Sequence, residues 1–237
     1  MVILRCELHV HSKASSDGIS TIDEIIDAAN KLKIDAIAIT DHDTVDGAIS
    51  ALNYPDPKPI IIPGIEVSTQ QGHLLVLGTT EKIEPNRDVM ETIDEAKLKG
   101  AVTIVPHPFH IWRHAVGLHC PEALLISDAI EVYNSRYIMG TSNHTAYMIA
   151  QRYQKPMTTG SDSHESKFIG YGVTEINATD RSVDAILKAI QSGNTSCQGI
   201  KTPILSYTKE SWENTIRKIR RRIKYNNSGK RLRFRYK

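Results

Sequence analysis

Two short segments, far apart in the sequence, contain residues of the kinds that bind metal ions. The segment ELHVH near the amino terminus includes His9 and His11, and the segment GSDSH much later includes Asp162 and His164. Side chains two residues apart on a strand share one face, so each pair would present two ligands to the same point. One His-x-His pair is weak evidence, because two exposed histidines on a strand are common. The second pair makes a metal site the favoured interpretation.

Further histidines and carboxylates follow short apolar runs. His42 follows the run 34–40, Glu66 follows 59–65, and His107 follows 101–105. Imidazole and carboxylate ligands without thiolates suit Zn, Mn or Fe, and the set is too large for one ion. We therefore expect two or three divalent ions, with Glu66 as a bridge. The predicted metal ligands are His9, His11, Asp17, His42, Glu66, His107, Asp162 and His164, and His73, which begins another apolar run, is a further candidate.

Closely spaced divalent ions suit the hydrolysis of phosphoesters. One ion activates a water molecule, and together the ions neutralise charge on the phosphoryl group. The sequence contains no Gly-x-Ser-x-Gly or Walker motif that would favour another scheme. We therefore expect metal-activated water as the nucleophile and assign catalysis to Asp17, His42, Glu66 and His164. Arg113 and Arg136 are candidate ligands of a substrate phosphate.

Apolar runs alternate with helical periodicity along the chain. A capping box at Thr21 begins one predicted helix, and Gly193 is placed to end another. This alternation predicts mostly parallel strands, whose carboxyl ends gather the loops of a site. Since the ligands follow five strands, we expect an α/β fold with about seven strands in one closed, barrel-like sheet, within a domain of residues 1–208. The expected strands are 3–11, 34–40, 59–65, 72–78, 101–105, 128–133 and 156–160, and the expected helices are 22–33, 89–99, 143–153 and 182–193.

The composition is that of an ordinary globular protein. Of 237 residues, 40% are hydrophobic and 24% are charged, and no apolar run approaches the roughly 20 residues that a spanning helix needs. The first residues lead directly into a charged strand rather than a signal peptide, so we expect a cytoplasmic location. Cys6, Cys120 and Cys197 are odd in number and widely spaced, which favours reduced thiols.

Residues 209–237 form a basic tail. They contain 12 Lys and Arg against two Glu, although the whole chain has a net charge of only +2. Near the end, arginines alternate with Leu232, Phe234 and Tyr236, a pattern that suits single-stranded nucleic acid because rings stack on bases while cations pair with phosphates. A helix packed on the acidic body and an anchor on anionic lipid are the alternatives. A tail that packs on the body and keeps the protein soluble explains this pattern as well as a tail that binds nucleic acid does.

Five motifs occur in order over residues 3–176: His9-x-His11, Thr40-Asp41-His42, Gly64-Ile65-Glu66, His107-Pro108 and GSDSH. Together they resemble the polymerase-and-histidinol-phosphatase (PHP) superfamily. The resemblance implies a distorted seven-stranded (β/α) barrel with a bi- or trinuclear metal centre at its mouth, which catalyses phosphoester hydrolysis. Asp17 followed by Gly18 resembles the branch of TrpH-type enzymes, which act on nucleoside bisphosphates and on the 5′ ends of short RNAs.

Asn134 departs from the superfamily pattern, because many members carry another metal-binding histidine near this position. The second ion would then be bound more weakly or with an extra water, and Asn134 is itself a candidate ligand. Two functions remain. One is a metal-dependent phosphoesterase, either a phosphatase on nucleotides or small phosphomonoesters or an exonuclease on short RNA or DNA. The other is a non-catalytic nucleic-acid-binding subunit on the same scaffold, like the barrel protein of archaeal RNase P. The nearly complete ligand set favours the enzyme.

Overall fold

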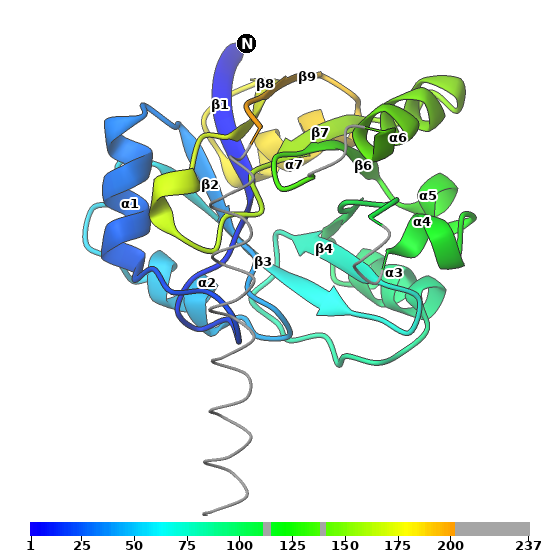
Figure 1. The fold of residues 1–237 in the computed structure, drawn as a ribbon. Coiled ribbons are helices and arrows are strands. Elements are labelled where there is room, and N and C mark those ends of the chain that lie inside the picture. Colours follow the sequence, from blue (N-terminus) through cyan, green and yellow to red (C-terminus); the bar gives the residue numbers. More distant parts are fainter. Residues whose placement is uncertain (111–114, 138–140, 202–237) are drawn as a thin grey trace, which may run out of the picture. The chain divides into compact units, whose positions relative to one another are not determined.

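One sheet of nine strands lies at the centre of the described part of the fold (Figure 1). The computed structural model describes residues 1–110, 115–137 and 141–201. The strands follow the order β7-β6-β5-β4-β3-β2-β1-β8-β9 across the sheet. Their bounds are β1 (Val2–Val10), β2 (Ala36–Ile39), β3 (Ile60–Ser68), β4 (His73–Leu77), β5 (Val102–Val105), β6 (Ala129–Asn134), β7 (Met157–Gly160), β8 (Gly172–Ala178) and β9 (Thr195–Gly199). The first seven correspond to the predicted strands.

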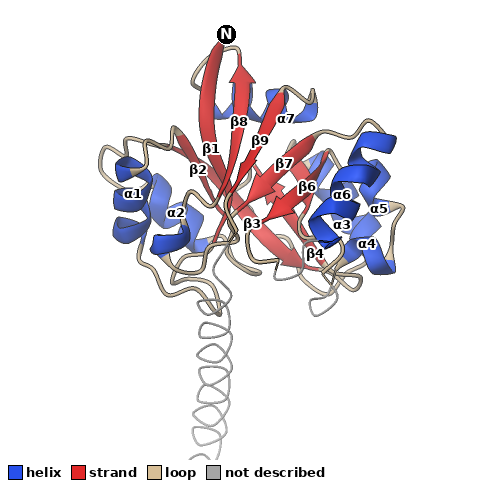
Figure 2. Cartoon of the chain, turned by 45° about the horizontal axis from the view of Figure 1, so that its top comes forward, coloured by secondary structure: helices blue, strands red, loops and turns tan. Residues whose placement is uncertain are grey.

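Helices cover the outer faces of this sheet. Figure 2 shows α1 and α2 on one side of the strands and α3 to α6 on the other. Their bounds are α1 (Ile22–Lys31), α2 (Asp46–Leu52), α3 (Val89–Leu98), α4 (Val116–His119), α5 (Ala123–Ile126), α6 (Thr141–Arg152) and α7 (Val183–Gln191), with a 3₁₀ turn η1 (Ser166–Phe168). The predicted capping box of Thr21 and Glu24 begins α1. In the described part of the chain, no helix has the length and apolar character that a membrane span requires.

Parallel and antiparallel pairs are equally common in the sheet, so the prediction of mostly parallel strands was too simple. β1–β2, β2–β3, β5–β6 and β6–β7 are parallel, whereas β3–β4, β4–β5, β1–β8 and β8–β9 are antiparallel. The turn at residues 69–72 sends β4 back beside β3, and β8 and β9 were not expected. Because β4 runs backwards, its first residue lies at the edge where β3 ends.

The sheet curls into a nearly closed barrel, as predicted. Side chains from seven of the strands meet in one core, which includes Leu4 of β1 and Ala178 of β8. Strands at such distant places in the sheet order can share a core only if the sheet curves back on itself. Ile186 and Ile190 of α7 join this core, and Figure 2 places α7 beside β8 near the start of β1. At the other end, Val10 pairs with Ser163, just beyond β7, in a parallel bridge.

Two strands contain a β-bulge close to that second end, which we call the mouth. β1 advances three residues between Glu7 and Val10 while β2 advances two. β6 advances two residues between Glu131 and Tyr133 while β7 advances one. An extra residue changes which side chains point inward beyond it. Leu8 and His9 are adjacent, yet the bulge of β1 lets both side chains point inward. Leu8 packs in the core and His9 faces the mouth.

Candidate metal centre

The mouth of the barrel gathers every predicted metal ligand. His9 lies at the end of β1 and His11 just beyond it, while His42 and His107 follow β2 and β5. Glu66 lies in β3, Asp162 and His164 follow β7, and Asp17 comes from the loop between β1 and α1. His73 begins β4 and pairs with Ser68 across the hairpin, so the antiparallel strand brings it to the same edge.

The carboxylate of Glu66 lies at the centre of this cluster. Its Oε2 is 3.2 Å from Nε2 of His9, 3.1 Å from Nε2 of His11 and 3.3 Å from Nδ1 of His42. Its Oε1 is 3.1 Å from Nε2 of His107 and 3.0 Å from Nδ1 of His73. Five imidazoles around one carboxylate match the expected bridging position.

The ligand atoms fall into four overlapping groups, each compact enough to surround an ion. The groups among the described residues are His11–Asp17–His42–His164, His9–His11–Glu66, His9–His107–Asp162 and His42–Glu66–His73. Nitrogen and oxygen donors in this number suit Zn, Mn or Fe. Since several residues occur in two groups, the arrangement fits neighbouring ions that share ligands.

His11 provides a test of whether the cluster fits metal ions. Both of its ring nitrogens are buried, and neither makes a hydrogen bond to a described residue. Its Nε2 lies 3.1 Å from Glu66 and 3.5 Å from Asp162, but without the geometry of a hydrogen bond. Buried polar groups without hydrogen bonds are rare in proteins. A divalent ion shared with the two carboxylates would give Nε2 a partner, so the residues fit a metal.

Two of the ligands adopt backbone conformations that L-residues seldom occupy. His107 has φ of 31° and Asp162 has φ of 51°. Such conformations cost free energy and persist where the surrounding structure enforces them, commonly at functional sites. Each residue lies two positions beyond the end of its strand, β5 for His107 and β7 for Asp162.

Six of the nine clustered residues are buried, and three are partly exposed to solvent. His9, His11, Glu66, His107, Asp162 and His164 are buried. Asp17, His42 and His73 have side chains that are 12%, 14% and 21% exposed. A substrate that reaches the cluster would therefore meet these three residues first.

Burial and neighbouring charges act in opposite directions on the pKa values of the ligands. Burial lowers the pKa of His42 to about 3, and burial together with Arg136 lowers the pKa of His164 to about 4. Burial opposes the charge on Asp17 as well, but the imidazoles of His164 and His42 outweigh it and hold its pKa well below the usual range. The shifts at His42 and His164 favour neutral imidazoles and the shift at Asp17 favours the carboxylate, which are the states that metal ligands require. At His9 and His11 the neighbouring carboxylates outweigh burial and raise the pKa of each imidazole.

Two aspartates beside His42 hold loops of the mouth in place. Asp41 accepts from the backbone N–H of Ser12 at 2.6 Å and from its hydroxyl at 2.7 Å, which fixes the start of the loop that carries Asp17. Asp43 accepts from the backbone N–H and the hydroxyl of Ser68, at 2.7 and 2.9 Å, and so fixes the end of β3.

The predicted phosphate ligand Arg136 is buried behind the cluster. Its exposed fraction is 6%, and its guanidinium contacts Nδ1 of His164 and lies 3.2 Å from the backbone oxygen of Asp162. Arg113 lies outside the described residues, as does the basic tail.

The side chain of Asn134 makes three hydrogen bonds beside the cluster. Its Nδ2 donates to Glu131 at 2.9 Å and to Asp162 at 3.3 Å, and its Oδ1 accepts from the backbone N–H of Arg136 at 3.0 Å.

Sequence reasoning missed the role of Glu131 beside the cluster and the burial of His110. Glu131 is a buried carboxylate in contact with His9, and His110 is buried with its ring stacked on Tyr137 at 5.0 Å between centroids. A charged residue inside the apolar run 129–132 was the available signal for Glu131. His110 stands in an irregular segment, without the strand spacing that identified the other histidines.

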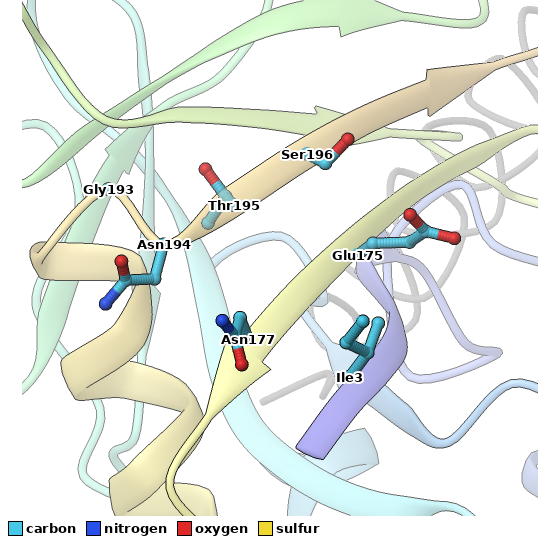
Figure 3. A pocket seen from close by; sticks show the side chains of 7 residues that line it. All are labelled: Ile3, Glu175, Asn177, Gly193, Asn194, Thr195 and Ser196. Atoms are coloured by element: carbon cyan, nitrogen blue, oxygen red, sulfur yellow. The ribbon is translucent and has the colours of Figure 1, made fainter. Parts of the chain in front are cut away.

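A separate hollow lies at the opposite end of β1. Its walls come from Ile3 and from parts of β8 and β9, and include Glu175, Asn177 and Ser196 (Figure 3). One carboxylate and no histidine line it, so it lacks the donors of the mouth. The ligand cluster is therefore the candidate site.

A barrel with a cluster of histidines and carboxylates at its mouth is the architecture of a metal-binding scaffold. The sequence matches the family profile described as PHP domain over residues 7–160 and the profile described as PHP-associated over residues 140–195. The chain therefore belongs to the PHP domain family, as its motifs predicted.

Relatives in an archaeon have no assigned activity. Two uncharacterized proteins of Methanocaldococcus jannaschii, MJ0417 and MJ1587, are 31% identical over 166 residues and 28% identical over 154 residues. The first alignment covers 68% of this chain and 65% of the relative, and the second covers 60% and 89%.

Solved structures share the fold at low sequence identity. A two-domain protein of Bacteroides vulgatus that contains a predicted PHP-like metal-dependent phosphoesterase has a TM-score of 0.64 at 20% identity, over 90% of this chain and 70% of that chain. A lesion-specific endonuclease of Pyrococcus furiosus has a TM-score of 0.65 at 17% identity, over 83% and 58% of the two chains. These similarities establish the barrel and leave the substrate open.

Proposed function

We propose that the protein is a metal-dependent phosphoesterase whose reaction takes place at the mouth of the barrel. The observation that carries this proposal is the carboxylate of Glu66 within 3.3 Å of five imidazoles. Divalent ions bound there would supply a nucleophile by lowering the pKa of water and would neutralise charge on a phosphoryl oxygen. The fold and the family support the same class of reaction.

The proposal gives the protein's own residues distinct tasks. His9, His107 and Asp162 form the buried part of the centre, and Glu66 joins it to the part that faces solvent. Asp17, His42 and His164 belong to that outer part, with His73 as a further ligand. Asp17 is held at 2.9 Å by the hydroxyl of Ser15. A phosphoryl group approaching from solvent would contact the outer part first.

The substrate-binding role of Arg136 is also part of the proposal. Arg136 lies beside His164, and its Nη1 is 3.8 Å from Oδ1 of Asp162. It would therefore neutralise charge through its contacts with these two residues, whereas the role of Arg113 in binding a substrate phosphate remains a prediction. A cytoplasmic location and Mn, Zn or Fe as the metal remain predictions.

The substrate class proposed is a phosphorylated nucleotide or another small phosphomonoester, or the end of a short RNA or DNA. The lesion-specific endonuclease with the same fold acts on nucleic acid, which makes oligonucleotides a necessary part of any screen. The non-catalytic alternative, a nucleic-acid-binding subunit, predicts binding without hydrolysis.

The test is a hydrolysis assay on protein freed of metal with a chelator. Nucleoside mono- and bisphosphates and end-labelled oligonucleotides are incubated with Mn²⁺, Zn²⁺ or Fe²⁺, and released phosphate or mononucleotide is measured. We expect hydrolysis that requires added metal and is lost in Glu66→Ala. A protein that binds no divalent ion and hydrolyses none of these esters would contradict the proposal, and oligonucleotide binding without hydrolysis would favour the alternative.

A further inference from the structure

Glu131 is a buried carboxylate that contacts the metal centre without belonging to any of the four ligand groups. Its Oε1 lies 3.0 Å from Nδ1 of His9. Its Oε2 accepts from the backbone N–H of His107 at 2.9 Å and from Nδ2 of Asn134 at 2.9 Å. One side chain of β6 is thus bonded to ligands from β1 and from the loop after β5.

We propose that Glu131 is a positioning residue of the metal centre, which holds His9 and His107 so that both direct Nε2 toward the same ion. This inference rests on the proposed metal-dependent function and adds to it a residue that sets the affinity of the buried part of the site.

The first step concerns the ring of His9. A carboxylate oxygen accepts hydrogen bonds, so the nitrogen beside it, Nδ1, carries the proton. Nε2 lies within hydrogen-bonding distance of a second carboxylate, that of Glu66, so it would become the metal-binding nitrogen once an ion lies between the two and the ring is neutral. That atom lies 3.2 Å from Glu66 and 3.8 Å from Asp162, at the centre of the cluster. Carboxylate partners of this kind orient metal-binding histidines and raise their basicity.

The second step concerns the backbone of His107. Its φ of 31° is costly for a residue with a side chain. The hydrogen bond from its N–H to Glu131 helps to hold this conformation, which places Nε2 of His107 3.1 Å from Glu66. Glu131 thus acts on the ring of one ligand and on the main chain of another.

The third step concerns the space around Glu131. Gly160, at the end of β7, leaves room for the carboxylate, because a Cβ at this position would lie 2.0 Å from Oε1 of Glu131 and 2.7 Å from Cβ of His9. The β-bulge at Glu131 and Tyr133 lets Asn134 also face the mouth, where it donates to the same carboxylate. Residues of β1, β6 and β7 therefore fit around the carboxylate.

The test compares Glu131→Gln with Asp128→Asn. Gln keeps the shape of the side chain, but its NH₂ group would face one of the N–H donors that now bind a carboxylate oxygen. Asp128 is a matched control, because it joins the other ends of β5 and β6 by accepting from the N–H and the hydroxyl of Thr103, both at 2.8 Å, far from the ligands. Titration calorimetry with Mn²⁺ and Zn²⁺ on the metal-free proteins measures affinity, and thermal unfolding without metal measures stability.

We expect Glu131→Gln to weaken the tightest metal site by about 10- to 100-fold, the usual cost of losing such a partner. Asp128→Asn should leave metal affinity within about twofold, even if both variants lose similar stability. Because Glu131 acts partly through His9, its substitution should cost less affinity in a His9→Ala background than in the wild type.

Three outcomes would overturn the assignment: unchanged affinity in Glu131→Gln, equal losses in Glu131→Gln and Asp128→Asn, or a loss that is the same with and without His9. These differ from a failure of the proposed function, in which the wild-type protein itself would bind no divalent ion.

Discussion

At the scale of single residues, exposure divides the ligands into two sets with different work to do. In the proposed metal centre the buried set would hold the ions, whereas Asp17, His42 and His73 are the side chains that solvent reaches. Asp17 is the acidic member of the exposed set and lies 3.3 Å from His164 and 3.7 Å from His42. Its carboxylate therefore supplies negative charge that an ion in the outer group needs.

Replacing Asp17 with Asn should selectively remove the outer ion. The amide keeps the size of the side chain but loses the charge that balances a divalent cation. We therefore expect affinity at one site to fall by at least about 100-fold, which is more than the loss of a residue that only hydrogen-bonds to a ligand costs. Calorimetric titration should then show fewer tight sites, and hydrolysis should fall in parallel. Asp46, the exposed first residue of α2, is the control. If Asp17→Asn and Asp46→Asn bind the same number of ions, Asp17 is not a ligand.

The sequence predicted the residues that cluster at the mouth better than the residues that contact them. Ligands such as His9 and Asp162 stand at strand ends in recognisable pairs, and strand periodicity predicts where their side chains point. Glu131 works through hydrogen bonds to residues distant in sequence, which no local pattern encodes. His73 was ambiguous because its direction depends on whether β4 runs parallel or antiparallel to β3.

At the scale of elements, the seven strands predicted from apolar runs are present, but their directions and irregularities were not all predictable. A hairpin needs only a short turn, so the segment between β3 and β4 was compatible with an antiparallel pair even in a chain that otherwise alternates strand and helix. A bulge adds one residue to a strand without a signal in the composition. The bulge in β1 is what allows the adjacent residues Leu8 and His9 to face the core and the mouth.

The loop between β1 and α1 depends on Asp41, which binds both the backbone and the hydroxyl of Ser12. We expect Asp41→Ala to free this loop, because two buried donors lose their acceptor. Amide hydrogen exchange at Ser12 and Ser15 should accelerate, and the outer metal site should weaken while the buried site keeps its affinity. Exposed Asp46→Asn serves again as the control. Exchange at the wild-type rate with intact metal affinity would show that the loop is held by other contacts.

At the scale of the whole molecule, closure of the sheet joins distant parts of the chain at one site. The bridge between Val10 and Ser163 and the bond from the N–H of His11 to the oxygen of Ser163 place the first ligand pair beside the last. All of these contacts lie within the compact unit Met1–Lys201. The domain boundary predicted at residue 208 and the basic tail lie outside the described residues and remain predictions.

Removal of residues 209–237 should separate the chemistry of the barrel from any contribution of the tail. Since the core and every described ligand lie in Met1–Lys201, we expect the truncated protein to unfold within a few degrees of the full chain and to hydrolyse nucleoside phosphates at a similar rate. If the tail binds nucleic acid, the truncated protein should bind single-stranded oligonucleotides more weakly. The slope of log affinity against log salt concentration should also become shallower, by about 0.7 for each lost phosphate contact. Full-length protein with Arg231, Arg233 and Arg235 replaced by Gln is the matched control, because it keeps the tail and removes only three charges. Unchanged oligonucleotide affinity and salt dependence in both proteins would exclude a nucleic-acid role for the tail and favour packing or solubility as its purpose.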